Sequence, residues 1–175
     1  GPRREIGIRT VFNILGPLTN PAGATAHLIG VADPAYGEKM AQVLGTMGST
    51  HALVVHGSDG LDEITLGGHT RVWEMKEGTV SSYNLSPEEL GFSRVRREVL
   101  RAGNVDESVR MLRVVLEGTP GPARDIVLMN SAAALMAADR AATFSDGVEL
   151  AVESIGSGRA LEKLDALVRL SSELE

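Results

Sequence analysis

The sequence AHLIGVADPAYGEKMAQVLGTMGSTHALVVHG, at residues 26–57, holds two short apolar runs with an amphipathic segment between them. The runs at 26–32 and 51–57 are almost continuously apolar, which is typical of strands buried on both faces of a parallel sheet. A helix between them is predicted by apolar residues that recur every three or four positions: Met40, Val43, Leu44 and Met47. The order strand, helix, strand indicates a right-handed parallel crossover unit.

The pattern changes at residues 68–84, immediately downstream of this unit. Two runs with strand propensity lie on either side of Lys76-Glu77-Gly78 and predict a β-hairpin, with Gly78 supplying a positive φ. We expect this hairpin to be an antiparallel addition at the margin of the sheet.

The chain from residue 104 onward is predicted to be helical. Asn104 is a candidate N-cap, and Glu107 follows it at the spacing of a capping box. Further helices are expected at about 122–139, 147–156 and 158–174. The last of these has an apolar stripe that we expect to be buried, formed by Leu161, Leu164, Leu167, Val168 and Leu170.

These elements predict an α/β fold with a mainly parallel sheet, flanking helices and an antiparallel hairpin. The length of 175 residues suits a single domain. Residues 4–20 predict a short helix and a turn at Gly16-Pro17. Gly1-Pro2 resembles the scar that a protease leaves when a purification tag is removed, with a natural start as the alternative.

The composition excludes several classes of function. A net charge of -6 and an aromatic content of 3% argue against a nucleic-acid surface or a base-stacking platform. The absence of cysteine excludes disulfides and thiolate metal sites, and it permits a reducing cytoplasmic location. No apolar run approaches the roughly 20 residues that span a bilayer, so no membrane partner is expected.

An acidic loop follows the second apolar run. It reads HGSDGLDEIT at residues 56–65 and carries Asp59, Asp62 and Glu63. Open α/β sheets bind ligands beyond the carboxyl ends of their parallel strands, which is where this loop is expected. One or two carboxylates suffice for Mg²⁺, which keeps several waters and shares substrate phosphates. The alternative is an ordinary solvated loop, and the spacing does not fit an EF-hand.

A second group of candidate residues lies near the N-terminus. Arg3 offers a planar fork for a carboxylate, and Gly16-Pro17 fixes an unusual backbone in the turn between Asn13 and Pro21. Together they could hold an aromatic acid. The alternative is a solvated basic cluster beside a turn that only ends a helix.

The remaining polar candidates favour structural roles. The four histidines, including His51 and His56 at strand ends, contain no pair four residues apart, so a histidine metal site is not indicated. Asn130 lies within an alanine-rich helix, and we expect it to satisfy a neighbouring backbone group. No nucleophile, triad or catalytic histidine is evident.

Three stretches together resemble the anthranilate phosphoribosyltransferase family: RREIGIRTVFNILGPLTNP at 3–21, HGSDGLDEIT at 56–65 and LMNSAAAL at 128–135. They occur in the family's order. The resemblance implies a fold of the nucleoside phosphorylase and phosphoribosyltransferase C-terminal domain type. It also implies transfer of a 5-phosphoribosyl group from phosphoribosyl pyrophosphate to anthranilate in tryptophan biosynthesis, with Mg²⁺ assisting the departure of pyrophosphate.

The resemblance assigns roles to five residues. Arg3 resembles the arginine that meets the anthranilate carboxylate, and Gly16 and Pro17 resemble residues that line the same pocket. Asp62 and Glu63 resemble the acidic pair that holds magnesium beside the pyrophosphate. Residues 3–20 would join a helical domain, and residues 21–175 would form the α/β domain.

The family's glycine-rich phosphate loop and most of its helical domain have no counterpart in this sequence. We therefore expect the chain alone to bind phosphoribosyl pyrophosphate weakly and not to turn over. The family is homodimeric through its helical domain, so we expect a monomer here. Two alternatives stay open: a pyrimidine nucleoside phosphorylase-like enzyme, and a noncatalytic α/β interaction module.

Overall fold

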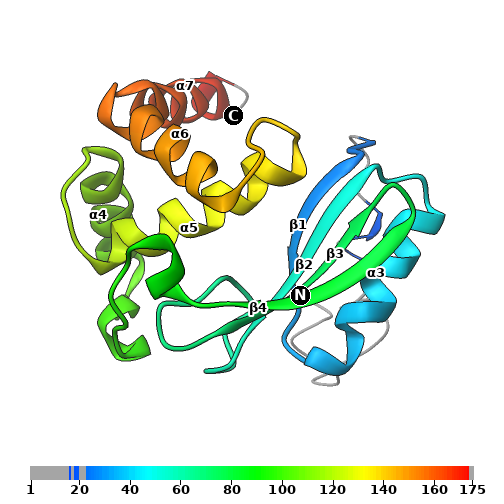
Figure 1. Cartoon of the computed structure of the whole chain (residues 1–175). Coiled ribbons are helices and arrows are strands. Elements are labelled where there is room, and N and C mark those ends of the chain that lie inside the picture. Colours follow the sequence, from blue (N-terminus) through cyan, green and yellow to red (C-terminus); the bar gives the residue numbers. More distant parts are fainter. Residues whose placement is uncertain (1–15, 17, 20–22, 174–175) are drawn as a thin grey trace, which may run out of the picture.

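The core of the fold is a four-stranded mixed sheet. The computed structural model describes residues 16, 18–19 and 23–173. Its strands follow one another in the sheet in the order of the sequence (Figure 1). They are β1 (Ala26–Gly30), β2 (His51–Gly57), β3 (Thr70–Lys76) and β4 (Thr79–Leu85).

The predicted crossover unit is confirmed. β1 and β2 pair in parallel, from Ala26 opposite His51 to Gly30 opposite Val55. The connection holds a short 3₁₀ helix, η1 (Pro34–Tyr36), followed by α3 (Gly37–Thr46). The two carboxyl ends of the parallel strands therefore lie at the same edge of the sheet, which is where the acidic loop begins.

The expectation of a mainly parallel sheet is wrong for the described strands. β2 pairs with β3 and β3 pairs with β4 in antiparallel fashion, so one pairing of the three is parallel. The sequence shows a single crossover helix, and the chain after β2 instead returns through the predicted hairpin. Its turn has two successive positive φ values, 50° at Glu77 and 80° at Gly78, as a two-residue hairpin requires.

Helices cover the two faces of the sheet differently. α3 packs on one face against a cluster that includes Ala52, Val54 and Trp73, and α5 (Pro122–Ala137) packs on the other against Leu53 and Val55. This alternation along β2 is the period-two pattern of a strand buried on both faces. α6 (Phe144–Gly156) then lies on α5, where the absence of a side chain at Gly147 lets the helix backbones approach closely.

The helical C-terminal region begins as predicted. The Asn104 side chain accepts a hydrogen bond from the Glu107 amide at 2.9 Å and caps α4 (Val105–Leu116). The Glu107 carboxylate accepts from the Gly103 amide at 2.7 Å, one residue earlier than in a strict capping box. No helix of the described ranges is long and apolar enough to cross a membrane.

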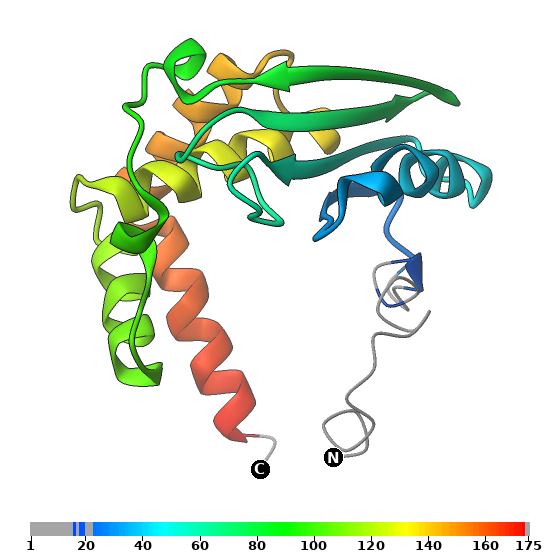
Figure 2. The same ribbon diagram turned by 90° about the horizontal axis from the view of Figure 1, so that it is seen from below.

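The predicted burial of the apolar stripe on α7 (Arg159–Glu173) is wrong. Leu161 and Leu164 are half-buried, whereas Leu167, Val168 and Leu170 are exposed. α4 and α7 leave the sheet on the same side and extend beyond it (Figure 2). An amphipathic pattern indicates that a helix face suits a partner, but it does not tell whether the described chain supplies one.

Candidate functional site

The loop after β2 folds back over the carboxyl ends of β1 and β2. The Gly57 amide donates to the Leu61 carbonyl at 2.8 Å, and the Gly60 amide donates to the Gly57 carbonyl at 2.9 Å. The backbone of Asp62 then lies directly against Gly30, where a Cβ atom would come within 1.5 Å of the Asp62 carbonyl oxygen. Glycine at the end of β1 therefore allows the acidic residues to lie at the end of the parallel pair.

Asn130 of α5 holds the loop from the other side. Its side-chain amide pairs with both backbone groups of Ile64, accepting from the amide at 2.9 Å and donating to the carbonyl at 2.9 Å. Ile64 is fully buried, so these two bonds satisfy groups that water cannot reach. The expected backbone role of Asn130 is confirmed, and it positions the residue next to Glu63.

Asp59 is part of the loop's internal structure. Its carboxylate accepts from the Thr65 hydroxyl at 2.8 Å and from the Leu61 amide at 3.3 Å. Gly57 and Gly67 lie so close that a Cβ on either would come within 2.7 Å of a carboxylate oxygen. Of the three loop carboxylates, Asp59 is therefore already committed to hydrogen bonds within the loop.

Asp62 and Glu63 have a different environment. Both are exposed, and neither side chain forms a hydrogen bond or an ion pair with the part of the chain that the structure describes. Partial burial of the Glu63 carboxyl raises its pKa above the ordinary value, and the neighbouring negative charge of Asp62 raises it further. A cation placed at these carboxylates would stabilise their charged forms and so oppose both effects.

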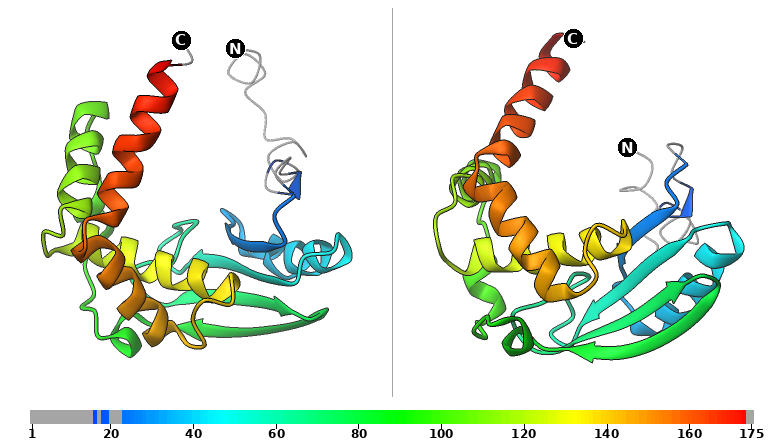
Figure 3. Two further views of the ribbon diagram at one scale, coloured as in Figure 1. Left: turned by 90° about the horizontal axis from the view of Figure 1, so that it is seen from above. Right: turned by 45° about the horizontal axis from the view of Figure 1, so that its top comes forward.

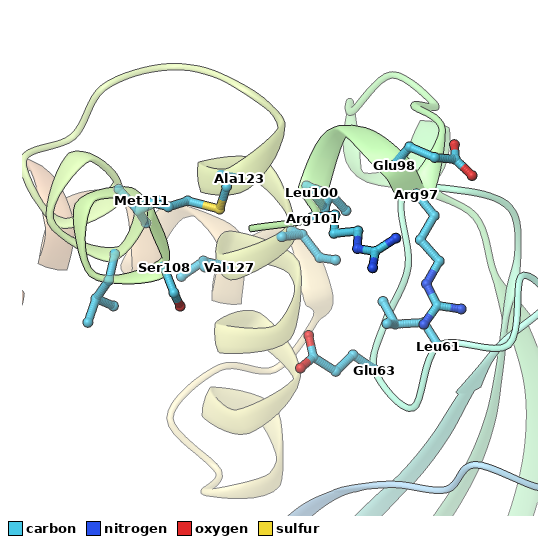
Figure 4. A pocket seen from close by; sticks show the side chains of 13 residues that line it. Leu61, Glu63, Arg97, Glu98, Leu100, Arg101, Ser108, Met111, Ala123 and Val127 are labelled. Atoms are coloured by element: carbon cyan, nitrogen blue, oxygen red, sulfur yellow. The ribbon is translucent and has the colours of Figure 1, made fainter. Parts of the chain in front are cut away.

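Glu63 lies on the wall of a cleft of about 720 Å³ between the acidic loop, α4, α5 and the 3₁₀ helix η3 (Arg97–Leu100). Figure 4 shows its carboxylate on the same side of the cleft as Leu61 and Arg97, with Met111 and Ser108 of α4 opposite. The Arg97 guanidinium donates to the Asp59 carbonyl at 3.4 Å. The rim also carries Glu98 and Arg101, and the floor is apolar, with Leu100, Met111, Leu112, Val115, Ile126 and Val127.

The second predicted group of residues is only partly described. Arg3 and Pro17 lie outside the described residues. Gly16 is exposed, and its carbonyl accepts from the Thr19 amide at 3.3 Å, while Leu18 packs on the α3 side of the sheet. Nothing in the described ranges places Gly16 beside Asp62 or Glu63, so the pocket for an aromatic carboxylate stays a prediction.

The histidines at strand ends have structural roles, as expected. His51 is buried between two carboxylates, with Glu74 at 2.8 Å and Asp139 at 3.3 Å. His56 bonds to the Val31 carbonyl at 2.8 Å. Within the residues described, no group of three or more His, Cys, Asp or Glu side chains is arranged to hold a metal ion. A site of two carboxylates that shares waters and substrate oxygens remains compatible with this finding.

Sequence reasoning missed Gly30 and Arg97 as contributors to the site, and it did not identify the partner of Asn130. Gly30 has a readable signal, since an isolated glycine in a strand marks a close backbone approach. Asn130 has a polar signal in an apolar helix, but its partner Ile64 is 66 residues away in the sequence. Arg97 has no local signal at all, because only the folded chain brings η3 to the acidic loop.

The fold and the acidic loop define a class that comparison with known proteins identifies. The chain belongs to the glycosyl transferase family, a/b domain, which matches residues 1–161. Among curated proteins, it is 53% identical to the anthranilate phosphoribosyltransferase of Symbiobacterium thermophilum over 98% of this chain and 50% of the relative. It is also 53% identical to that of Pelobacter propionicus, over 99% of this chain and 49% of the relative.

Solved structures agree with the curated relatives. Anthranilate phosphoribosyltransferase from Thermus thermophilus superposes with a TM-score of 0.86 at 42% identity, over 95% of this chain and 49% of that one. The Saccharomyces cerevisiae enzyme in complex with PRPP and Mg gives a TM-score of 0.81 at 30% identity, over 93% of this chain and 47% of that one. The chain thus spans about half the length of the curated relatives that it matches.

Proposed function

We propose that this chain is the metal-binding α/β half of an anthranilate phosphoribosyltransferase. The whole enzyme would transfer the 5-phosphoribosyl group of phosphoribosyl pyrophosphate to the amine of anthranilate and release pyrophosphate, a step of tryptophan biosynthesis. The similarity to enzymes of that name supports this interpretation over a pyrimidine nucleoside phosphorylase or a noncatalytic module. A cytoplasmic location belongs to the same proposal.

The observation that carries the proposal is the environment of Asp62 and Glu63. The backbone of Asp62 lies against Gly30, and Asn130 holds the backbone of the adjoining Ile64, yet the carboxylates of Asp62 and Glu63 have no partner within the described part of the chain. Hard carboxylate oxygens at the end of two parallel strands fit Mg²⁺, and a cation there would oppose the burial and the Asp62 charge that raise the pKa of Glu63. When bound, Mg²⁺ would neutralise charge that develops on the departing pyrophosphate.

The chain's own contribution to transfer is positioning. The loop presents two carboxylates at a fixed strand end, so a metal and diphosphate bound there would lose little further freedom on the way to reaction. Arg3, Gly16 and Pro17 are proposed to hold the carboxylate of anthranilate, with residues 3–20 linking to a helical domain and 21–175 forming the α/β domain. Magnesium, anthranilate and phosphoribosyl pyrophosphate are thus the proposed ligands.

The chain alone is expected to bind phosphoribosyl pyrophosphate weakly, without turnover, and to be monomeric. Phosphates are usually cradled by glycine-rich loops and helix N-termini, and the proposal assigns these to the other half of the enzyme. A steady-state assay of the purified 175-residue chain tests this expectation. Ordinary turnover by this chain would show that the division of the site between two halves is wrong.

The metal site is tested by amide NMR of the labelled chain during titration with MgCl₂ in the presence of inorganic pyrophosphate. Signals of residues 58–64 should shift, whereas Trp73 is a poor reporter because it packs against α3 on the other face of the sheet. Asp62→Asn and Glu63→Gln should each abolish the shifts. The matched control, Glu149→Gln on exposed α6 surface, should leave them unchanged. Shifts that persist in both loop variants would exclude these residues as the metal site.

A further inference from the structure

A buried chain of hydrogen bonds runs beneath the acidic loop. In Figure 3 this loop, between β2 and β3, leaves the end of the sheet and turns back beside α5. The Thr65 amide donates to the Thr70 hydroxyl oxygen at 3.0 Å, and the Thr65 hydroxyl donates to Asp59 Oδ2 at 2.8 Å. The Thr65 hydroxyl oxygen also accepts from the Gly67 amide at 2.9 Å. Both threonines are fully buried, so water does not compete for these groups.

The direction of these bonds requires a side chain at position 59 that only accepts. A hydroxyl has one hydrogen, and Thr65 donates it to Asp59. The other carboxylate oxygen of Asp59, Oδ1, accepts from the Leu61 amide at 3.3 Å. Both oxygens therefore face donors. An ionised aspartate satisfies both of them, whereas an asparagine would turn its own NH₂ group toward one.

Two glycines leave room for this carboxylate. A Cβ at Gly57 would come within 2.7 Å of Asp59 Oδ1, and a Cβ at Gly67 would come within 2.5 Å of Oδ2. Neither glycine has a positive φ, so it is the space taken by Asp59, and not the backbone conformation, that excludes a side chain there. The surroundings of Asp59 are therefore specific for a carboxylate.

Asp59 connects the two limbs of the loop on either side of the acidic pair. It precedes the tip at 60–63 and Thr65 follows the tip, so their hydrogen bond closes the tip at its base. The return limb is itself fixed, because Thr65 is fully buried. The adjacent negative charges of Asp62 and Glu63 repel one another when no cation is bound. A closed base holds the tip together against this repulsion.

We propose that Asp59 is a positioning residue of the metal site, and that its hydrogen bond to Thr65 holds Asp62 and Glu63 where they can bind a cation together. This inference rests on the proposed function. A site whose groups are held in advance loses less conformational entropy on binding, and groups that hold metal-binding carboxylates tune the affinity for the metal. Asp59 itself does not contact the cation, because donors of the loop occupy both of its oxygens.

The test separates the hydroxyl group of Thr65 from its bulk. Thr65→Val keeps the volume and removes the hydroxyl, whereas Thr65→Ser keeps the hydroxyl and loses a buried methyl group. Binding of MgCl₂ in the presence of inorganic pyrophosphate is measured by titration calorimetry on chains that circular dichroism shows to be folded. Thr65→Val should weaken it by about tenfold or more, and Thr65→Ser should stay within about threefold of the unaltered chain.

Two further variants complete this comparison. Asp59→Asn should weaken Mg²⁺ binding as much as Thr65→Val does, because one of its donors loses an acceptor. Thr50→Val removes a hydroxyl that donates to the Thr25 carbonyl at the other end of β2, and this control should bind as the unaltered chain does. If Asp59 were itself a metal ligand, Thr65→Val would free its carboxylate and retain the affinity, which would overturn the inference.

A second readout needs no metal. Without the hydroxyl the tip should open, so the Gly60 and Leu61 amides should exchange with deuterium about tenfold faster in Thr65→Val than in Thr65→Ser. Equal exchange in the two variants, or equal Mg²⁺ binding by them, would contradict the positioning role. If the exchange difference is found but the unaltered chain does not bind Mg²⁺ with pyrophosphate, the proposed function, and not the closed tip, would be wrong.

Discussion

The acidic loop and the apolar face of α4 and α7 differ in how completely the described chain supports them. This α4–α7 face consists of six exposed side chains: Val105, Val109, Leu112, Leu167, Val168 and Leu170. The loop is held by Gly30 from β1, by Asn130 from α5 and by hydrogen bonds of Asp59, so its shape is set within this chain. The α4–α7 face has apolar side chains and no cover within the described residues. The contrast indicates that the shape of the acidic loop is set by contacts within the described chain, whereas these apolar side chains of α4 and α7 have no such support.

The largest expected effect comes from removing the anchor of the loop. Asn130→Leu leaves the buried amide and carbonyl of Ile64 without partners, and each unpaired group costs about 1–3 kcal/mol, so we expect a loss of about 4 kcal/mol in the free energy of unfolding. Chemical denaturation followed by circular dichroism measures it. Asn84→Leu, at an exposed position of β4, is the control and should have little effect. A loss of similar size in both variants would mean that Asn130 does not anchor the loop.

The second prediction compares leucines of the two kinds of region. Leu44 of α3 is almost fully buried, and Leu44→Ala should cost about 3 kcal/mol through lost burial and the cavity left behind. Leu167→Ala on the α4–α7 face should change stability by less than about 0.5 kcal/mol in the chain alone. Thermal or urea unfolding of both variants gives the difference. Equal costs would show that α7 is already covered in solution, and the contrast between the regions would disappear.

The third prediction tests the close approach at the end of β1. Gly30→Ala places a Cβ within 1.5 Å of the Asp62 carbonyl oxygen, so the loop must move away, at a cost of about 2 kcal/mol typical of overpacking. The amide signals of 58–64 should shift even without metal, and the response to Mg²⁺ should weaken. Gly48→Ala is a control with open space around it, although its φ of +94° adds local strain. An unchanged loop in Gly30→Ala would remove the proposed role of this glycine.

The sequence alone predicts best those features of the fold that depend on a few adjacent residues. The bounds of β2 agree with the apolar run at 51–57, and the hairpin turn and the Asn104 cap are confirmed, because each depends on a few adjacent residues. The mixed character of the sheet and the exposure of α7 depend on which elements come together. Neither periodicity nor composition carries that information.

The candidate site likewise has a part that the sequence alone predicts and a part that depends on contacts between distant residues. The position of Asp62 and Glu63 after a parallel strand follows from the strand pattern, and the structure places their loop at the expected edge. The partners that hold this loop come from residues far away in the sequence, such as Asn130, and could not be assigned. Arg3 and Pro17 lie outside the described residues, so the proposed pocket for anthranilate still rests on the family resemblance.

The smallest expected effect is the change in the free energy of unfolding caused by Glu63→Gln, and its sign depends on whether Mg²⁺ is bound. Because the folded-state pKa of Glu63 is raised, its carboxyl favours the folded state when protonated and disfavours it as pH rises through that pKa. Glu63→Gln should therefore stabilise the metal-free chain slightly at neutral pH, by less than about 0.5 kcal/mol for an exposed group, and the gain should vanish in acid. With Mg²⁺ and pyrophosphate the unaltered chain should instead be the more stable of the two, since ligand binding stabilises only the chain that can bind.

Differential scanning calorimetry at two pH values, each with and without metal, measures the stability difference between the two chains under all four conditions. A Glu63→Gln variant that gains as much from Mg²⁺ as the unaltered chain would show that the cation binds elsewhere.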